Sequence, residues 1–221
     1  MGKRGPKPKG KVVIKWSSNL AYAIGLLTTD GCLSPSGRHI VLVSKDREQL
    51  ENFMIALNIK ISIGKTRSGY TGKTTTRIQF GDIVFYRFLL DIGLTQNKTR
   101  TIGAIKIPRK YFFDFLRGHF DGDGCAYSYF DPRWKSSFMF YTTFVSASER
   151  HILWLQKEIF RQLGIKGHIT RDGRKLTIQL KFAKAGSMKL FHKMYPNKNT
   201  LCLSRKRLKI EKMLSIVGER L

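Results

Sequence analysis

The sequence has few acidic residues: 15 aspartates and glutamates stand against 41 lysines and arginines, which gives a formal net charge of +26. A compact chain with this charge repels itself, so a polyanionic partner is expected. A nucleic-acid phosphate backbone is the first candidate and a membrane surface is the second. A generic basic ribosomal-type protein is a further alternative, but 15 phenylalanines and 8 tyrosines indicate a larger core than such proteins need.

Long hydrophobic runs and paired cysteines are also missing. No apolar run reaches the roughly 18 residues of a membrane span, and no stretch has the pattern of a signal peptide. The three cysteines, Cys32, Cys125 and Cys202, form no C-x-x-C pair, and the five histidines lack ligand spacing. This predicts free thiols in an intracellular, reducing compartment, either a bacterial cytoplasm or an organelle, and no zinc site.

The chain contains a degenerate internal repeat. Residues 24–32 (IGLLTTDGC) and 117–125 (RGHFDGDGC) both end in Asp-Gly-Cys, with a glycine five residues before the aspartate. Further along, LNIK at 57–60 matches LGIK at 163–166, and TRIQF at 76–80 echoes TIQLKF at 177–182. Periodicity after each motif predicts one α-β-β-α-β-β-α unit in each half, so the chain should be an internal duplication.

The expected organisation follows from this repeat. It comprises a flexible basic arm at 1–11, a first half at 12–94, a linker at 95–109 and a second half at 110–221. A longer turn is expected at 131–137, and a basic C-terminal helix at 203–218 has no counterpart in the first half. The arm is interpreted as a non-specific phosphate-binding or solubilising tail, with minor-groove binding as the alternative.

The stretches AIGLLTTDG (23–31) and LRGHFDGDG (116–124) resemble the paired signature of the LAGLIDADG homing endonucleases. The glycine of the signature corresponds to Gly25 and Gly118, and its acid corresponds to Asp30 and Asp123. The resemblance covers almost the whole chain and implies an α+β fold of two pseudo-symmetric halves. Each half would carry a four-stranded antiparallel sheet, and the two signature helices would pack together through their glycines.

The resemblance further implies that Asp30 and Asp123 hold divalent cations at the scissile phosphates. Mg²⁺ is the expected ion, with Mn²⁺ as a substitute, because carboxylates bind hard cations and metals assist phosphodiester hydrolysis. By the same resemblance, the carbonyls of Thr29 and Gly122 are additional ligands. The alternative is turn chemistry, since Asp-Gly is a common turn pair. An EF-hand is excluded because Cys125 occupies a ligand position.

Basic residues near the sheet ends are candidates to assist the attacking water or stabilise charge. Lys45 is the choice in the first half, and Lys181 or Lys184 in the second. The alternative for each is contact with a DNA phosphate or with solvent only. Asp121 aligns with Thr28, so it is not expected to be catalytic; an ion pair with Arg117 on the helix surface is expected instead.

The alternation in KLTIQLKF assigns Leu176, Ile178, Leu180 and Phe182 to the core and leaves a polar face with no acids. Arginine, glutamine, threonine and lysine are side chains that read base edges in the major groove. A solvated sheet face is the alternative. The DNA-contacting candidates are Arg38, Arg67, Lys73, Thr75, Arg77, Gln79, Arg133, Lys135, Arg171, Arg174, Lys175, Thr177, Gln179 and Lys181.

The resemblance therefore implies a monomeric, metal-dependent endonuclease that cleaves both strands of a long, imperfectly palindromic double-stranded DNA site. The main alternatives are an RNA maturase that assists intron splicing and a DNA-binding regulator that does not cut. The endonuclease domain of an intein fits poorly, because the sequence has no nucleophilic start and no His-Asn end.

Overall fold

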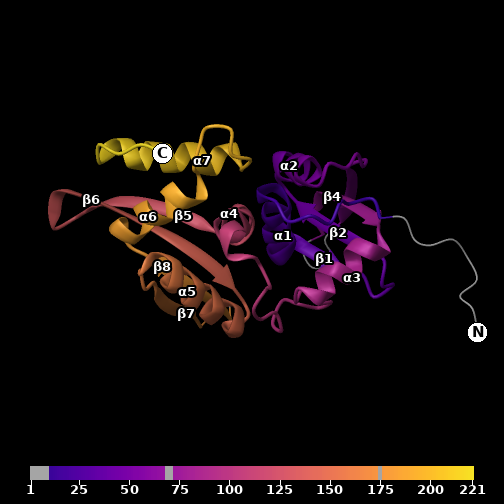
Figure 1. Cartoon of the computed structure of the whole chain (residues 1–221). Coiled ribbons are helices and arrows are strands. Elements are labelled where there is room, and N and C mark those ends of the chain that lie inside the picture. Colours follow the sequence, from indigo (N-terminus) through magenta and orange to yellow (C-terminus); the bar gives the residue numbers. More distant parts are fainter. Residues whose placement is uncertain (1–9, 68–71, 174–175) are drawn as a thin grey trace, which may run out of the picture.

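The computed structural model of the chain describes residues 10–67, 72–173 and 176–221, apart from the side chains of residues 135 and 172 (Figure 1). Most of the predicted basic arm lies outside the described residues. Its last residue, Lys11, is fixed by a hydrogen bond from its backbone N–H to Asp82 Oδ2 at 2.6 Å.

Each half has the predicted order of elements, which confirms the fold class. The first half contains α1 (Ser18–Asp30), β1 (Gly31–Leu33), β2 (His39–Ser44), α2 (Arg47–Leu57), β3 (Gly64–Arg67), β4 (Thr74–Gly81) and α3 (Ile83–Asp91). The second contains the 3₁₀ turn Arg109–Tyr111, α4 (Phe112–Asp123), β5 (Cys125–Asp131), β6 (Trp134–Ser146), α5 (Glu149–Leu163), β7 (His168–Asp172), β8 (Thr177–Phe182) and α6 (Lys184–Met194). Helix α7 (Ser204–Ile216) follows.

The two sheets have the same topology. The strand order is β1-β2-β4-β3 in the first half and β5-β6-β8-β7 in the second, with every neighbouring pair antiparallel. Helices α1 and α4 lie side by side between the two sheets (Figure 1). Each helix leads directly into the first strand of its own half, so the aspartate that ends each helix lies beside the helix–helix interface.

Local sequence explains where the helices begin and end. The Ser17 hydroxyl accepts a hydrogen bond from the Leu20 N–H at 3.1 Å and caps α1, and Asp82 caps α3 through the Phe85 N–H at 2.9 Å. Asn58 follows the last residue of α2 and Gly164 follows that of α5, both as C-caps in the left-handed conformation that asparagine and glycine tolerate.

Two expectations about strands were wrong. The turn predicted at 131–137 is much shorter, because β5 runs to Asp131 and β6 begins at Trp134. Leu176 is not a core residue: it precedes β8 with a φ of 52° and is 68% exposed, whereas Leu180 and Phe182 are buried as predicted. None of the helices among the described residues is long and apolar enough to span a membrane.

Candidate active site

Two glycines allow α1 and α4 to approach backbone to backbone. A Cβ atom on Gly25 would overlap the Phe115 carbonyl oxygen and lie 2.6 Å from the His119 nitrogen. A Cβ atom on Gly118 would overlap the Tyr22 carbonyl oxygen. Because no larger residue fits at either position, these glycines fix the crossing point of the two helices.

The crossing brings Asp30 and Asp123 to one place. A third glycine contributes, because a Cβ on Gly122 would lie 2.8 Å from Asp30 Oδ2 and overlap the Thr29 hydroxyl. Gln49 Nε2 donates to Asp30 Oδ2 at 2.6 Å, whereas no hydrogen bond between described residues reaches the carboxylate of Asp123. The two acids therefore lie together but in unequal surroundings.

Electrostatics show that the two carboxylates interact. Desolvation and the negative charge of Asp30 raise the pKa of Asp123 to about 6, although Asp123 is an exposed residue. Burial also raises the pKa of the half-buried Asp30, opposed by the hydrogen bond from Gln49. A pair of acids that disfavours its own ionisation is a good place for a cation.

Two lysines that sequence reasoning missed supply cationic groups here. Lys98, buried in the segment predicted to be a linker, donates from Nζ to the Thr29 carbonyl at 3.1 Å. Lys206, in α7, donates to the Gly122 carbonyl at 3.2 Å and to the carbonyls of residues 120, 121 and 124. Each lysine thus contacts the carbonyl of the residue just before one of the two acids.

The two lysines affect the two acids to different degrees. Of the two, Lys98 opposes the raised pKa of Asp123 more, and Lys206 opposes that of Asp30 more. Burial lowers the pKa of Lys206 to about 8 and also lowers the pKa of Lys98. Asp30, Asp123, Lys98 and Lys206 are therefore one charged cluster assembled across the helix interface.

The donor set suits a hard divalent cation. The two carboxylates and the carbonyls of Thr29 and Gly122 offer oxygen ligands only, as Mg²⁺ prefers. No group of three or more histidine, cysteine, aspartate or glutamate side chains lies together in the described part of the chain, so a metal held here would need additional oxygens from water or a substrate phosphate. The residues fit a metal that is shared with its substrate.

The three lysines proposed from sequence lie in three different places. Lys45 follows β2 and lines a cavity of about 530 Å³ with Asp30, Gln49 and Gly122. Lys181 is half-buried within β8, opposite Thr143, and Lys184 is the first residue of α6. Neither Lys181 nor Lys184 is among the charges that shift the pKa of Asp123, whereas Lys98 and Lys206 are.

The prediction of a surface ion pair between Arg117 and Asp121 was wrong. Asp121 is completely buried, and its Oδ2 accepts hydrogen bonds from the Tyr22 hydroxyl and the Leu203 N–H, both at 2.8 Å. Arg117 is buried too and pairs with Asp114 at 2.9 Å. Asp121 faces the other helix and the start of α7, because the glycines draw α1 onto this side of α4.

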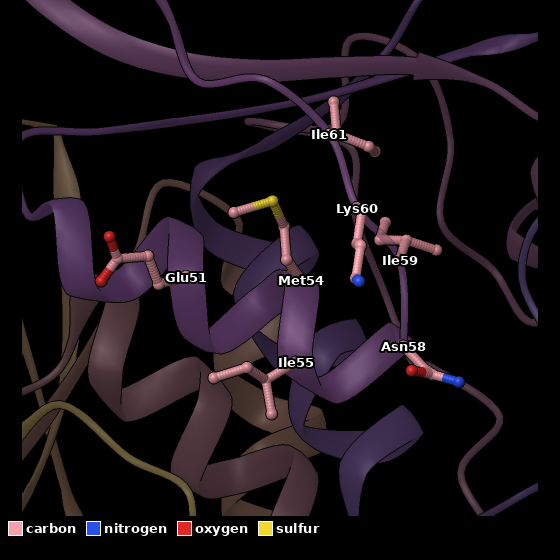
Figure 2. Close-up of a pocket in the computed structure, with 7 residues that line it drawn as sticks. All are labelled: Glu51, Met54, Ile55, Asn58, Ile59, Lys60 and Ile61. Atoms are coloured by element: carbon pink, nitrogen blue, oxygen red, sulfur yellow. The ribbon is translucent and has the colours of Figure 1, made fainter.

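A second hollow lies away from the acids. Figure 2 shows its seven lining residues, from α2 and the chain that follows, including the apolar side chains of Met54, Ile55, Ile59 and Ile61. Its volume is about 640 Å³. It contains one acid, Glu51, and one base, Lys60, and neither of the two signature acids lines it.

The predicted DNA-contacting residues of the strands share the outer sheet faces. In the first half, Val41 lies opposite Gln79 and Val43 opposite Arg77, on the face turned away from buried Ile78 and Phe80. Arg77 and Gln79 are exposed. In the second half Thr177, Gln179 and Lys181 alternate with Leu180 and Phe182 in the same way and are half-buried. Each half therefore presents a polar sheet surface.

The outer face of the second half also carries a stack of tyrosines. Tyr127 and Tyr129 of β5 lie on either side of Tyr141 of β6, with ring centroids 5.2 and 6.1 Å from it and planes within 15° of parallel. The register continues from β5 through Thr143 to Lys181, so the stack shares the polar face of β8. In the first half, Cys32 and Val41 pair as Cys125 and Thr143 do, but β1 ends at Leu33, before the position that aligns with Tyr127.

Several predicted contacts have other partners or lie outside the described residues. Arg133 pairs with Asp131 at 3.0 Å, and Arg171 pairs with Glu149. Arg67 donates to the Gly72 carbonyl at 2.9 Å in its own hairpin. Arg38 and Lys73 are exposed. Arg174, Lys175 and the side chain of Lys135 lie outside the described residues.

Comparisons with solved structures identify the fold. The homing endonuclease I-WcaI bound to its DNA recognition sequence aligns with a TM-score of 0.59 and 13% identity over 88% of each chain. The N-terminal LAGLIDADG domain of DUF199/WhiA aligns with a TM-score of 0.54 and 17% identity over 91% of this chain and 90% of that domain. Full-length DUF199/WhiA from Thermatoga maritima aligns with a TM-score of 0.58 and 16% identity over 93% of this chain. This chain spans 62% of the length of that protein.

The chain therefore has the LAGLIDADG fold, as its duplicated signature indicated. No family model matches the sequence, and no curated protein matches it either. At these identities the comparisons establish the fold alone.

Proposed function

We propose that the protein is a site-specific endonuclease that cleaves both strands of a long double-stranded DNA target. The observation that carries this proposal is the charged cluster at the helix interface: two acids, each next to a carbonyl that a lysine contacts. Two strands require two hydrolytic centres, and the duplicated halves supply one acid each. A role limited to capping turns would require neither the clustering of the acids nor the buried lysines.

Asp30, Asp123 and the carbonyls of Thr29 and Gly122 would hold the metal, with Mg²⁺ as the proposed ion. When bound, such an ion supplies Lewis-acid stabilisation of the leaving oxygen and activation of water. Lys98 and Lys206 would place positive charge where the pentacovalent phosphate develops negative charge. Gln49 orients the Asp30 carboxylate by its hydrogen bond, and no described residue does so for Asp123.

The outer sheet faces would bind the DNA duplex, with the net charge of +26 providing most of the affinity. Arg77 and Gln79 have the donor geometry for purine edges, and the tyrosine stack offers hydroxyls and ring edges in the second half. The two halves would therefore recognise unlike half-sites, which fits a target that is only imperfectly palindromic. Support comes from I-WcaI, whose structure contains its DNA recognition sequence.

A second candidate is a DNA-binding protein with this fold that does not cut. One observation favours it: the ammonium groups of Lys98 and Lys206 already satisfy the carbonyls of Thr29 and Gly122. A site closed by its own cations would neutralise the acids without a metal. The DNA-binding surface is common to both candidates, so only a cleavage experiment separates them.

Selection from a DNA library tests the proposal. Purified protein with Mg²⁺ is incubated with a large library of duplexes, beside the Asp30→Asn/Asp123→Asn double variant, and the cut ends are sequenced. One long motif cut on both strands by the wild type alone is the expected result. Tight, salt-sensitive binding without any enriched cut site would overturn the endonuclease and favour the non-cutting candidate.

A further inference from the structure

The segment that delivers Lys206 to the acids is held in part by the first half of the protein. Asn52 of α2 donates from its amide to the Cys202 carbonyl at 2.8 Å, in a buried contact. Glu48 of the same helix accepts a hydrogen bond from the Ser204 N–H at 3.0 Å, at the start of α7. Lys206 belongs to the second half in sequence, and α2 of the first half adds an anchor to those that α4 provides through Asp121, which accepts from the Leu203 N–H, and Arg117, which donates to the Leu201 carbonyl.

The segment that follows Lys98 is held by the second half. The Ser148 hydroxyl, just before α5, donates to the Ile102 carbonyl in a buried contact. His151, one turn further along, hydrogen-bonds through Nδ1 to the Gly103 carbonyl at 2.7 Å. The anchors come from the beginning of α5, which occupies in the second half the place that α2 occupies in the first.

Both lysines lie one turn of chain from their anchors. The Ile102 N–H donates to the Lys98 carbonyl at 2.9 Å, and the Lys206 N–H donates to the Leu203 carbonyl at 3.0 Å. Such a short hydrogen-bonded connection transmits the position of the anchor to the lysine. Loss of one anchor should therefore loosen one lysine and leave the other in place.

We propose that Asn52, in the first half, is a positioning residue for Lys206 of the second half, and that Ser148, in the second half, is a positioning residue for Lys98 of the linker. The charged cluster is then complete only while both halves are docked on each other. Loosening α2 impairs the lysine that acts most on Asp30, and loosening the start of α5 impairs the lysine that acts most on Asp123. The consequence for cleavage rests on the proposed function, but the positioning itself does not.

Lysine labelling tests the positioning on the full chain without DNA or metal. Wild type, Asn52→Ala and Ser148→Ala are treated with formaldehyde and borohydride, and methylation of each lysine is followed by peptide mass spectrometry relative to exposed Lys189. The two variants are matched: each removes one side-chain donor to one carbonyl, and the Ser148 hydroxyl makes no capping hydrogen bond to α5.

The expected pattern is crossed. Asn52→Ala should raise the labelling rate of Lys206 about fivefold, the scale for loss of one buried hydrogen bond, and leave Lys98 unchanged. Ser148→Ala should do the reverse. Unchanged rates for both lysines, or equal increases for both in either variant, would overturn the proposal, because the first shows no anchoring and the second shows general loosening.

Strand-resolved cleavage of the selected target then connects the positioning to activity. The single-turnover rate should fall about fivefold or more in each variant while the Kd for DNA stays within about twofold. A wild type that binds but never cuts would refute the endonuclease and leave the labelling result standing. A crossed labelling pattern with unchanged cleavage rates would refute only the contribution of these anchors to catalysis.

Discussion

At the scale of single residues, Gly25 and Gly118 determine whether the two acids can meet at all. Alanine at either position would place a methyl group on the backbone of the other helix, and backbone cannot move aside as a flexible side chain does. We expect Gly25→Ala or Gly118→Ala to lower the free energy of unfolding by about 3 kcal/mol or more, measured by chemical denaturation.

The control for these variants is Gly103→Ala, because an added Cβ at Gly103 meets no atom within 4 Å. It should change the free energy of unfolding by less than about 0.5 kcal/mol. Equal stability of Gly25→Ala and Gly103→Ala would show that the helices do not cross as closely as the structure has them.

The sequence allowed the acids and glycines to be identified, because each appears twice at the same spacing. The lysines could not be found in this way. The best repeat match to Asn97-Lys98-Thr99 is Asn197-Lys198-Asn199-Thr200, yet Lys198 is exposed and Lys206 occupies the site. Likewise, spacing suggested an Arg117–Asp121 pair, but the crossing of α1 and α4 buried both residues with other partners.

At the scale of elements, the start of α5 should make stability depend on pH. Burial lowers the pKa of His151 to about 4, so the folded state holds the neutral ring while the unfolded chain gains a proton below about pH 6.5. Stability from this group is complete above pH 6.5 and is lost as the pH falls toward 4, by up to about 3 kcal/mol. Stacked His119 and the charge of Lys98 lie on its other sides.

Comparison with His151→Gln isolates this effect. Asp121 has the opposite effect between about pH 4 and pH 6, because burial raises its pKa to about 6. Its contribution to the free energy of unfolding therefore falls as the pH rises through this range. That carboxyl is common to both proteins. The free energy of unfolding at pH 7 minus that at pH 5 should therefore be smaller in the variant than in the wild type. Identical differences in both proteins would contradict the assignment.

The tyrosine stack on β5 and β6 offers a second prediction for an element. Removing its central ring in Tyr141→Ala should weaken binding to the selected duplex by about 1 kcal/mol or more, roughly fivefold in Kd. Tyr141→Phe keeps the ring and tests the hydroxyl separately. Fluorescence anisotropy measures both. An unchanged Kd for Tyr141→Ala would remove this face of the second half from the DNA interface.

The order of helices and strands along the chain was predictable because hydrophobic alternation identified most strands and the repeat showed the same order twice, whereas the four-stranded antiparallel sheets were implied by the family resemblance. The ends of the strands were harder to predict. The Asp-Pro-Arg sequence suggested a long turn before residue 138, yet Trp134, which is 70% exposed, already belongs to β6. Leu176 continued the apolar alternation but precedes the strand in a left-handed conformation. Pattern alone does not show where pairing with a neighbouring strand stops.

At the scale of the whole molecule, the net charge of +26 should make DNA binding strongly dependent on salt. Plotted as log K against log salt concentration, affinity should fall with a slope of about −0.9 for each phosphate that the protein neutralises. Anisotropy titrations between low and moderate salt measure the slope. A flat dependence would contradict the use of this charge to bind a nucleic acid.

The central claim is that Asp30 and Asp123 each serve one strand of a duplex. The most direct measurement is cleavage of the selected target, with each strand labelled separately, by Asp30→Asn and Asp123→Asn in Mg²⁺. Each variant should lose cleavage of one or both strands while its Kd for the target stays close to that of the wild type. Cleavage of both strands at the wild-type rate by either variant would contradict the account.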